Sequence, residues 1–453
     1  MFGEILQKFA EKSPITVMVR GLLEHLLNPE EVDRWFDSVR QVQYTKEILF
    51  SSIVSLMLQV VCNIRPSVHS AYRQADIGAS VVAVYDKLKG VETTTCQALV
   101  RQIASESEAI ISNLKGANDP LLPGYRVKFL DGNCIEAPEH RLKVLRDTRA
   151  GALPGKSLVV FDAELGVALD VFPCEDGDAQ ERALLTAVVA TIQPSDLWIA
   201  DRNFCVLSFL FDLHRKRAFF VIRQHGNTPY KPLSELKFIG QSATGRVSEQ
   251  RGRLTSPAGE TLMARRVVVE LEKPTRNGDK IVAILTHLPE EAADALIVAE
   301  LYRKRWGIET AFQKLEKHLN SEINTLGYPK AALFGFCLAL VAFNLYAVVM
   351  AALRSAYRDH DINDEVSEYY VAQEIATTYT GMLIAIPEDD WTVFTQASQA
   401  ELSGILLSLA AKVDLSKFKK NKRGPKKAPT PKTQFKGKPH VSTAKLLAAA
   451  TTG

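Results

Sequence analysis

Three carboxylates stand where a sheet and a helix could bring them together. Asp131 follows the apolar run "VKFL", Asp201 follows "LWIA", and Glu309 lies within a long charged helix. Asp201 therefore ends a predicted strand, as Asp131 does. In open α/β sheets, ligands bind beyond the carboxyl ends of the strands. An aspartate in such a place can also simply cap the helix that follows, and for Asp201 alone the two interpretations have similar weight.

The chemistry of such a group is set by its charge. In the predicted order β-β-β-α-β-α-β, the first and fourth strands are commonly neighbours, which would bring Asp131 and Asp201 together. Crowded carboxylates are costly unless a cation neutralises them. Oxygen ligands suit Mg²⁺ or Mn²⁺, and two such ions support phosphoryl transfer. We therefore expect a site for two Mg²⁺ (or Mn²⁺) ions.

The third carboxylate shares its predicted helix, residues 294–319, with a tyrosine and an arginine. If this helix is continuous, Tyr302, Arg305 and Glu309 lie along one stripe beside its apolar face. Next to the acids, Tyr302 and Arg305 would hold phosphates. The alternative is a solvated face with an ordinary Arg–Glu pair four residues apart, which stabilises a helix only slightly.

The remaining elements place this group in an α/β fold. Residues 1–115 read as helical and are expected to form a DNA-end-binding domain, although no specific helix-turn-helix signature is present. Residues 116–225 read as the first part of a mixed-sheet core. Residues 226–292 look like a β-rich insertion, residues 293–411 supply the last core helices and further C-terminal helices, and residues 412–453 form a basic tail expected to be flexible.

Taken together, Asp131, Asp201 in "ADRNF" and the run "YRKRWGIE" resemble the DDE transposases of bacterial insertion sequences. The narrower resemblance is to the group with a Tyr-x-x-Arg-x-x-x-Glu signature and a β insertion before the last acid, insertion-sequence family four. It covers about residues 120–355 and implies a ribonuclease-H-like core. It also implies that Asp131, Asp201 and Glu309 are the catalytic, metal-ligating residues and that Tyr302 and Arg305 contact phosphates of the DNA end.

Two positions depart from the family pattern. The family often has a lysine seven residues after the glutamate, where this chain has Glu316, and Lys317 is the nearest substitute. Some relatives stack a flipped base on a tryptophan of the insertion, and this chain has tryptophans only at 35, 198, 306 and 391. Either no hairpin intermediate forms, or another aromatic residue such as Tyr230 or Phe238 takes that role.

Other acids lie near the same predicted sheet, namely Asp162, Asp170, Asp176, Asp178 and Glu181. Asp162 is the main alternative to Asp131, because it too borders an apolar strand. Asp131 is preferred, since the first strand of such a core supplies the central carboxylate.

The charge of the chain is unevenly distributed. Residues 412–440 hold eleven of the 55 basic side chains and one of the 52 acidic ones, which leaves 44 basic and 51 acidic residues, a net charge of −7, elsewhere. A dense lysine run of this kind suits a polyanion, so we expect Lys419, Lys420, Lys422 and Arg423 to bind DNA. The alternative is a solubilising linker.

Cysteine usage and apolar runs bear on location. The six cysteines are scattered without a C-x-x-C pair, which fits a reducing cytosol, and the first residues lack the apolar core of a secretory signal. Residues 331–353 are apolar enough to span a membrane, but a buried core helix is favoured over a span. We expect the bacterial cytoplasm, at the nucleoid, and no membrane partner.

The sequence thus predicts a DNA transposase that cuts double-stranded DNA at the ends of its element and joins 3′ hydroxyls to target DNA. A homodimer in the synaptic complex is expected by analogy. The alternatives are a ribonuclease-H-like nuclease without strand transfer, and an inactive DNA-binding descendant.

Overall fold

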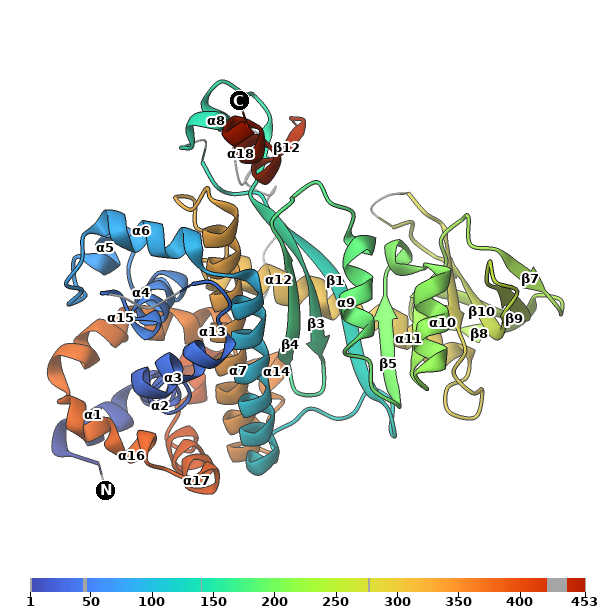
Figure 1. Cartoon of the computed structure of the whole chain (residues 1–453). Helices are drawn as coiled ribbons and strands as arrows, with labels where there is room; N and C mark the ends of the chain where they lie inside the picture. The colour runs from blue at the N-terminus through green and yellow to red at the C-terminus, as the bar shows by residue number, and fades with distance from the viewer. Residues whose placement is uncertain (1, 44–46, 140, 276–277, 422–437, 453) are drawn as a thin grey trace.

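The computed structural model describes residues 2–43, 47–139, 141–275, 278–421 and 438–452. Lys422 and Arg423 lie outside these ranges. A mixed sheet with its own helices adjoins a large helical body, and a small module of β2, α8, β12 and α18 stands at one end of the sheet (Figure 1).

Five strands form the central part of the sheet, in the order β4-β3-β1-β5-β6. β3 pairs antiparallel with β1 and with β4, whereas β5 runs parallel to β1 and to β6. Three consecutive antiparallel strands followed by two parallel additions make the ribonuclease-H-like arrangement that the sequence predicts. The strands are β1 (Arg126–Ile135), β3 (Gly155–Asp162), β4 (Val167–Cys174), β5 (Asp196–Ala200) and β6 (Phe219–Arg223).

Apolar side chains on both faces of these strands explain why helices cover the sheet on two sides. Along β5, Trp198 packs into the cluster with α9 (Leu185–Val189) and α10 (Leu207–Arg215), whereas Leu197 and Ile199 pack into the cluster on the other face. That second cluster includes residues of α11 (Ala295–Lys304) and α12 (Trp306–His318). Successive strand residues point to opposite faces, so a continuous apolar run is buried on both.

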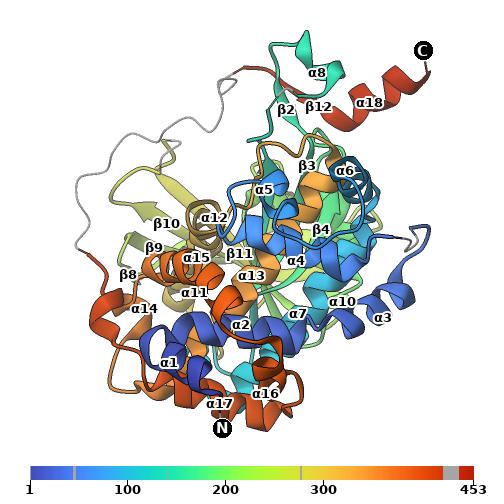
Figure 2. The ribbon, with the colours of Figure 1, turned by 90° about the vertical axis from the view of Figure 1, so that its left-hand side faces the viewer.

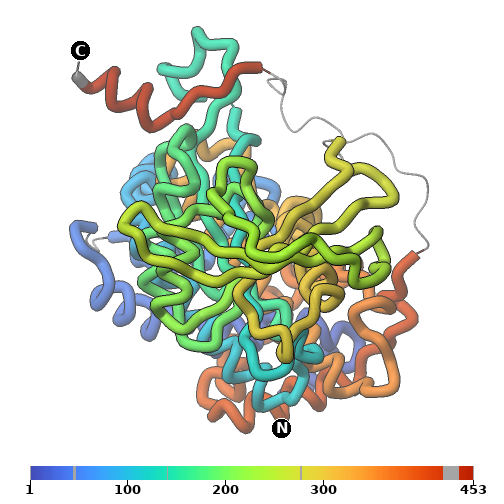
Figure 3. Tube along the Cα trace, turned by 90° about the vertical axis from the view of Figure 1, so that its right-hand side faces the viewer, coloured from blue at the N-terminus to red at the C-terminus, as the bar shows by residue number. Residues whose placement is uncertain are grey.

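The predicted insertion continues the core sheet. β11 pairs antiparallel with β6, and β10, β9 and β7 follow in order, with β8 beside β9, so one sheet of ten strands results (Figure 3). The backbone groups of β6 that would otherwise form an open edge are thereby paired with β11. The added strands are β7 (Tyr230–Pro232), β8 (Lys237–Gln241), β9 (Gly245–Thr255), β10 (Thr261–Leu271) and β11 (Ile281–Thr286).

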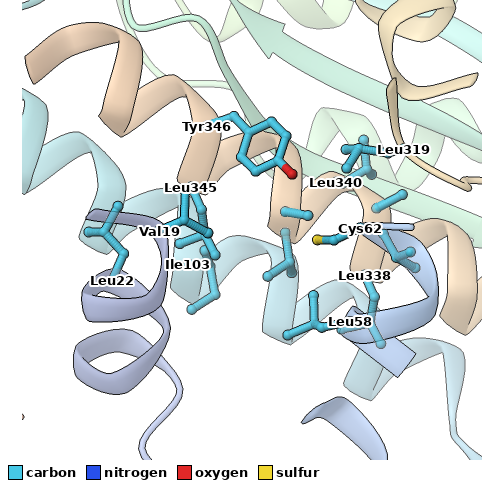
Figure 4. Packing of buried hydrophobic residues seen from close by; sticks show 14 of the residues in the cluster. Val19, Leu22, Leu58, Cys62, Ile103, Leu319, Leu338, Leu340, Leu345 and Tyr346 are labelled. Atoms are coloured by element: carbon cyan, nitrogen blue, oxygen red, sulfur yellow. The ribbon is translucent and has the colours of Figure 1, made fainter. Parts of the chain in front are cut away.

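The apolar segment at 331–353 lies within α13 (Pro329–Ala356), the central helix of the helical body. It is long and apolar enough to cross a membrane, and it is buried over nearly its whole length, as expected for a core helix. Its polar residue Asn344 accepts a hydrogen bond from the Ala168 N–H and donates one to the Ala168 carbonyl, which ties α13 to β4. Figure 4 shows the packing around Tyr346 and Cys62.

Helices from both ends of the chain surround α13 (Figure 2). The N-terminal helices are α1 (Glu4–Lys12), α2 (Pro14–Leu26), α3 (Pro29–Val39), α4 (Phe50–Val61), α5 (Val68–Tyr72), α6 (Val81–Gly90) and α7 (Thr93–Leu114). The C-terminal ones are α14 (Ile362–Glu365), α15 (Glu368–Ala385), α16 (Thr392–Thr395) and α17 (Gln399–Ala410). Because α2 packs against α15, α16 and α17, residues 1–115 share one core with the C-terminal helices.

The end of the chain is more ordered than its lysine content suggests. β12 (His440–Ser442) pairs in parallel with β2 (Gly151–Leu153), and α18 (Thr443–Thr452) packs on α8 (Lys143–Arg146). Nearer the start of the tail, Phe418 is buried in the short turn Leu415–Phe418. Residues 415–418 and 440–452 of the tail thus have defined secondary structure, and the expected flexibility of the tail stays a prediction. Averaging charge over the whole tail concealed the apolar stretch "VSTAKLLAAA" at its end.

One histidine is half-buried against the sheet between aromatic side chains. His287 follows β11, and its Nε2 lies 3.1 Å from the Ala218 carbonyl oxygen. Its ring packs against Phe220, with ring centroids 4.4 Å apart. Burial, together with the nearby His214, lowers the pKa of His287 to about 3. The folded protein thus holds this imidazole neutral.

A lowered histidine pKa makes stability depend on acid pH. Below pH 6.5, the ordinary pKa of histidine, His287 binds a proton in the unfolded chain but not in the folded one. The free energy of unfolding therefore falls as the pH decreases from 6.5 toward 3. Between pH 7 and pH 5 this contribution costs about 2 kcal/mol. We expect His287→Gln to flatten the decline in urea unfolding measured at both pH values. The control His360→Gln changes an exposed histidine. An equal decline in wild type and His287→Gln would contradict this assignment.

Candidate active site

Two aspartates extend from the same edge of the sheet. The parallel pairing of β1 with β5 ends at Leu130 opposite Ala200. The two strands are neighbours as predicted, and Asp201 is the residue after β5. Asp131 lies within β1, which continues to Ile135 in its pairing with β3, so the prediction that Asp131 ends its strand is wrong. The Asp131 side chain is 20% exposed, and its Oδ1 accepts a hydrogen bond of 2.9 Å from the Gly132 N–H.

Asp201 does not serve as a helix cap. A short turn, Arg202–Phe204, begins directly after it, and the Asp201 side chain makes no capping hydrogen bond there. Its Oδ1 instead accepts a hydrogen bond of 3.1 Å from the Tyr302 hydroxyl. Of the two interpretations of Asp201, the structure therefore favours the one in which its carboxylate faces a site.

The helix that carries the third acid is interrupted. A single continuous helix over 294–319 was predicted, but α11 ends at Lys304 and α12 begins at Trp306. At the break, the Arg305 N–H bonds to the Tyr302 carbonyl three residues back rather than four. A helical wheel assumes uniform rotation, so it misplaces residues across such a turn.

Arg305 joins the strand acid to the helix acid. Its guanidinium donates to Asp131 Oδ2 at 3.2 Å and to Glu309 Oε1 at 2.7 Å, and its side chain is only 7% exposed. The solvated-face alternative for this helix is thus wrong at Arg305, although Glu309 itself is 46% exposed. Tyr302 and Arg305 contact the acids directly, so any contact with phosphate would require them to move or to share their donors.

The crowding of these groups changes their pKa values. Burial raises the pKa of Asp131 from its ordinary 3.8 to about 6, and the charges of Glu309 and Asp201 add to the rise. Arg305 opposes that rise. Burial and the neighbouring Asp201 raise the pKa of Tyr302, so its hydroxyl stays protonated and able to donate. Although burial lowers the pKa of Arg305, its anionic neighbours raise it overall.

The donor set fits a divalent cation in kind, since carboxylate oxygens are the ligands that Mg²⁺ and Mn²⁺ prefer. Within the described residues, however, no three histidine, cysteine or acidic side chains are gathered closely enough to hold a metal ion as they stand. The Arg305 guanidinium already supplies positive charge between Asp131 and Glu309. A metal ion could bridge these acids only if Arg305 released at least one of them.

A further arginine at this edge, Arg223, was not predicted as a site residue. β6 pairs with β5 through Ala200 opposite Ile222, so Arg223 lies beside Asp201 in the register. Although burial lowers the pKa of Arg223, its bond to Asp279 and the nearby Tyr302 and Asp201 raise it overall. The ion pair with Asp279 measures 2.6 Å. A signal was present, because Arg223 ends the apolar run "AFFVI" as Asp201 ends "LWIA".

The alternative first acid lies elsewhere. Asp162 pairs in register with Lys128, three residues before Asp131 on β1, toward the opposite end of the strand. It bonds to Arg126 and accepts the N–H groups of the turn at 164–165. Asp170 is likewise held by Arg101. Both acids have structural partners away from Asp131 and Asp201.

The remaining predicted residues lie on the surface. Lys317 is exposed in the last turn of α12, next to the exposed Glu316. Lys419 and Lys420 are exposed beside α14, where Lys419 forms a β-bridge with Val366.

The two aromatic candidates of the insertion differ in accessibility. The Tyr230 hydroxyl donates to the Gln250 carbonyl, and its ring lies against Gly252. Phe238 is 57% exposed, with the guanidinium carbon of Arg246 4.9 Å from its ring centroid. Phe238 is therefore the more accessible surface for stacking.

Comparison with known proteins bears on this geometry. Residues 122–345 match the family model of the transposase DDE domain, a span that includes all three acids together with Tyr302 and Arg305. Among solved structures, a cryo-EM structure of the piggyBac transposase synaptic complex with hairpin DNA is similar at 9% identity and a TM-score of 0.41, over 85% of this chain and 86% of that one. A comparison with curated proteins gave no match.

The Arg305 bridge can be tested by its effect on stability. Replacing the arginine in Arg305→Met leaves two carboxylates without their shared cation, and breaking a buried pair in this way costs about 3 kcal/mol or more. The loss should be largest at pH 7 and smaller at pH 5, because Asp131 with a pKa of about 6 is then mostly protonated. Urea unfolding of the metal-free protein at both pH values measures it.

Arg303→Met is the matched control, since Arg303 pairs with Glu300 on the exposed side of α11. Exposed pairs contribute about 0–1 kcal/mol. Equal losses in the two variants, or a loss in Arg305→Met independent of pH, would contradict the bridging role.

Proposed function

We propose that this chain, whose residues 122–345 match the family model of the transposase DDE domain, is a DNA transposase that cuts at the ends of its own element and joins the 3′ hydroxyls to target DNA. One observation carries the proposal. Asp131 of β1, Asp201 after β5 and Glu309 of α12 are held together by Tyr302 and Arg305, within the matched residues.

In this proposal Asp131, Asp201 and Glu309 hold the divalent ions. Two bound Mg²⁺ or Mn²⁺ ions supply activation of the attacking oxygen and stabilisation of the leaving oxygen. Arg305, released from one acid, donates to a phosphate of the DNA end, and Tyr302 offers its protonated hydroxyl to another. A guanidinium matches phosphate as well as carboxylate geometry, so the same fork can serve both.

The narrower assignments belong to the proposal as well. The Tyr-Arg-Glu spacing supports the bacterial insertion-sequence group and, with it, the nucleoid as the place of action. Joining two ends in one synapsis supports a homodimer on double-stranded DNA. If a hairpin intermediate forms, the exposed Phe238 is the aromatic residue of the insertion placed to stack a flipped base.

The three acids should be essential for cutting and dispensable for binding. Asp131→Ala, Asp201→Ala and Glu309→Ala are each expected to lower cleavage of labelled element ends in Mg²⁺ by 10³-fold or more, on the order of 4 kcal/mol. Affinity for the ends in the absence of metal should not fall, because removing a carboxylate does not weaken attraction to DNA. Gel-resolved cleavage and strand-transfer products, with end binding by anisotropy, measure both.

Glu291→Ala, which changes an exposed acid just before α11, is the control. Products that are cut but never joined would favour the nuclease alternative, and bound, uncut DNA would favour the inactive descendant. Any one of the three variants that cleaves at the wild-type rate removes that residue from the proposed site.

The basic tail is proposed to bind DNA through its lysines and arginine. Deleting the tail from Lys412 would also remove the buried Phe418 and the β12–β2 pairing, so substitution is the cleaner test. Lys422→Gln with Arg423→Gln should weaken DNA binding and reduce the slope of log affinity against log salt by about 2, one for each lost phosphate contact.

The paired control, Lys8→Gln with Lys12→Gln, removes the same charge from the exposed surface of α1. Titrations between low and moderate salt should then leave the control slope at the wild-type value. Identical slopes in the tail variant and the control would favour the solubilising-linker alternative.

A further inference from the structure

A fourth carboxylate lies against the two segments that carry the aspartates. Glu181 opens the short turn Glu181–Leu184 that leads into α9, in the connection between β4 and β5. Its Oε2 accepts a hydrogen bond of 2.5 Å from the side-chain amide of Asn203. Asn203 is two residues beyond Asp201, so this bond reaches the turn that begins at the β5 aspartate.

The same carboxylate reaches the other strand. A Cβ atom placed on Gly132 would overlap Glu181 Oε1 and its carboxyl carbon. Gly132 is the residue after Asp131, and only a glycine there permits the approach. Glu181 therefore contacts both the residue that follows the β1 aspartate and the turn that follows the β5 aspartate.

Neighbouring contacts hold this bridge in place. Arg182 donates from Nε to the Asn203 carbonyl at 2.7 Å. The consecutive residues Glu181 and Arg182 thus bond to the side chain and to the backbone of Asn203. The loop before Glu181 is held to β3 by the Lys156 amine, which donates to the Ala179 carbonyl.

The bridge matters because Asp201 has little else to orient it. Its side chain makes no capping hydrogen bond within the turn that follows it, and it accepts a hydrogen bond from Tyr302 on another element. The direction of the Asp201 carboxylate thus depends on the backbone of the turn Arg202–Phe204. Two residues hold that turn in place: Phe204 is buried, and the Asn203 carbonyl accepts a hydrogen bond from Arg182.

We propose that Glu181 is a positioning residue that fixes the spacing of Asp131 and Asp201 through Gly132 and Asn203. The inference rests on the proposed function, because the spacing has a use only if the two aspartates bind metal. It gives the residues after each aspartate a shared role. The glycine admits the Glu181 carboxylate, and the asparagine donates to it.

Binding of Mn²⁺ to the protein without DNA, followed by electron paramagnetic resonance of the free ion, tests this without relying on cleavage. Partners in the outer shell of a metal site typically change affinity by about 10- to 100-fold. Glu181→Ala should weaken Mn²⁺ binding by about tenfold. Glu181→Gln should stay within about threefold of wild type, because its amide oxygen can still accept from Asn203.

Two further variants separate positioning from a general loss of structure. Asn203→Ala should weaken Mn²⁺ binding as much as Glu181→Ala, and the double variant should be no worse than either single one, since both remove the same bond. Glu175→Ala, on the same loop, is the control and should bind as wild type does. Asp131→Ala identifies the site, because loss of binding should leave the free-ion signal undiminished.

The outcomes are distinct. A Glu181→Gln protein as weak as Glu181→Ala would mean that the charge itself is used, which overturns the positioning role. Wild-type affinity in Glu181→Ala, or no Asp131-dependent binding in the wild type, also overturns it. If the wild type binds Mn²⁺ through Asp131 and yet cuts no element ends in Mg²⁺, the proposed function fails while the inference about Glu181 stands.

Discussion

The shared cation of Arg305 is the constraint on which the arrangement of the site depends. Three acids gathered at one sheet edge repel one another, and burial of Asp131 adds a desolvation cost. A guanidinium between Asp131 and Glu309 offsets both costs, and it does so from a turn between two helices. The break at Arg305 lets one segment direct a tyrosine toward β5 and an arginine toward β1. Stability of the metal-free fold and access for a metal ion are therefore opposed at the same side chain.

The sheet itself follows from a simple rule, which is why its central part could be predicted. Apolar runs that end in a polar residue marked β1 and β5, and their adjacency followed from the order of the elements. Trp198, Leu197 and Ile199 then pack on alternate faces, as a strand buried on both sides requires. The burial of the long apolar helix around Asn344 was also predictable, because one polar residue in such a helix needs only one pair of backbone partners.

What could not be predicted depends on contacts between distant parts of the chain. The turn at Arg305 is invisible to a helical wheel, because the wheel assumes one uniform rotation where α11 ends and α12 begins. Glu181 was one acid among several until Gly132 and Asn203 were seen on either side of it. The join between β6 and β11 depends on backbone pairing, which no side-chain pattern specifies. β12 and α18 were not predicted, because the lysines of residues 412–440 dominate the composition of the tail.

The packing of the two chain ends against each other has a consequence for how the protein is made. The Thr16 hydroxyl bonds to Glu374, 358 residues later in the chain, and α2 lies against α15, α16 and α17. Closing so long a loop costs entropy before any contact compensates it. During synthesis the apolar face of α2 lacks these C-terminal partners until residues 368–410 have left the ribosome. β11, the last strand of the ten-stranded sheet, ends at Thr286, so the helical body is completed only after the whole sheet has been synthesised.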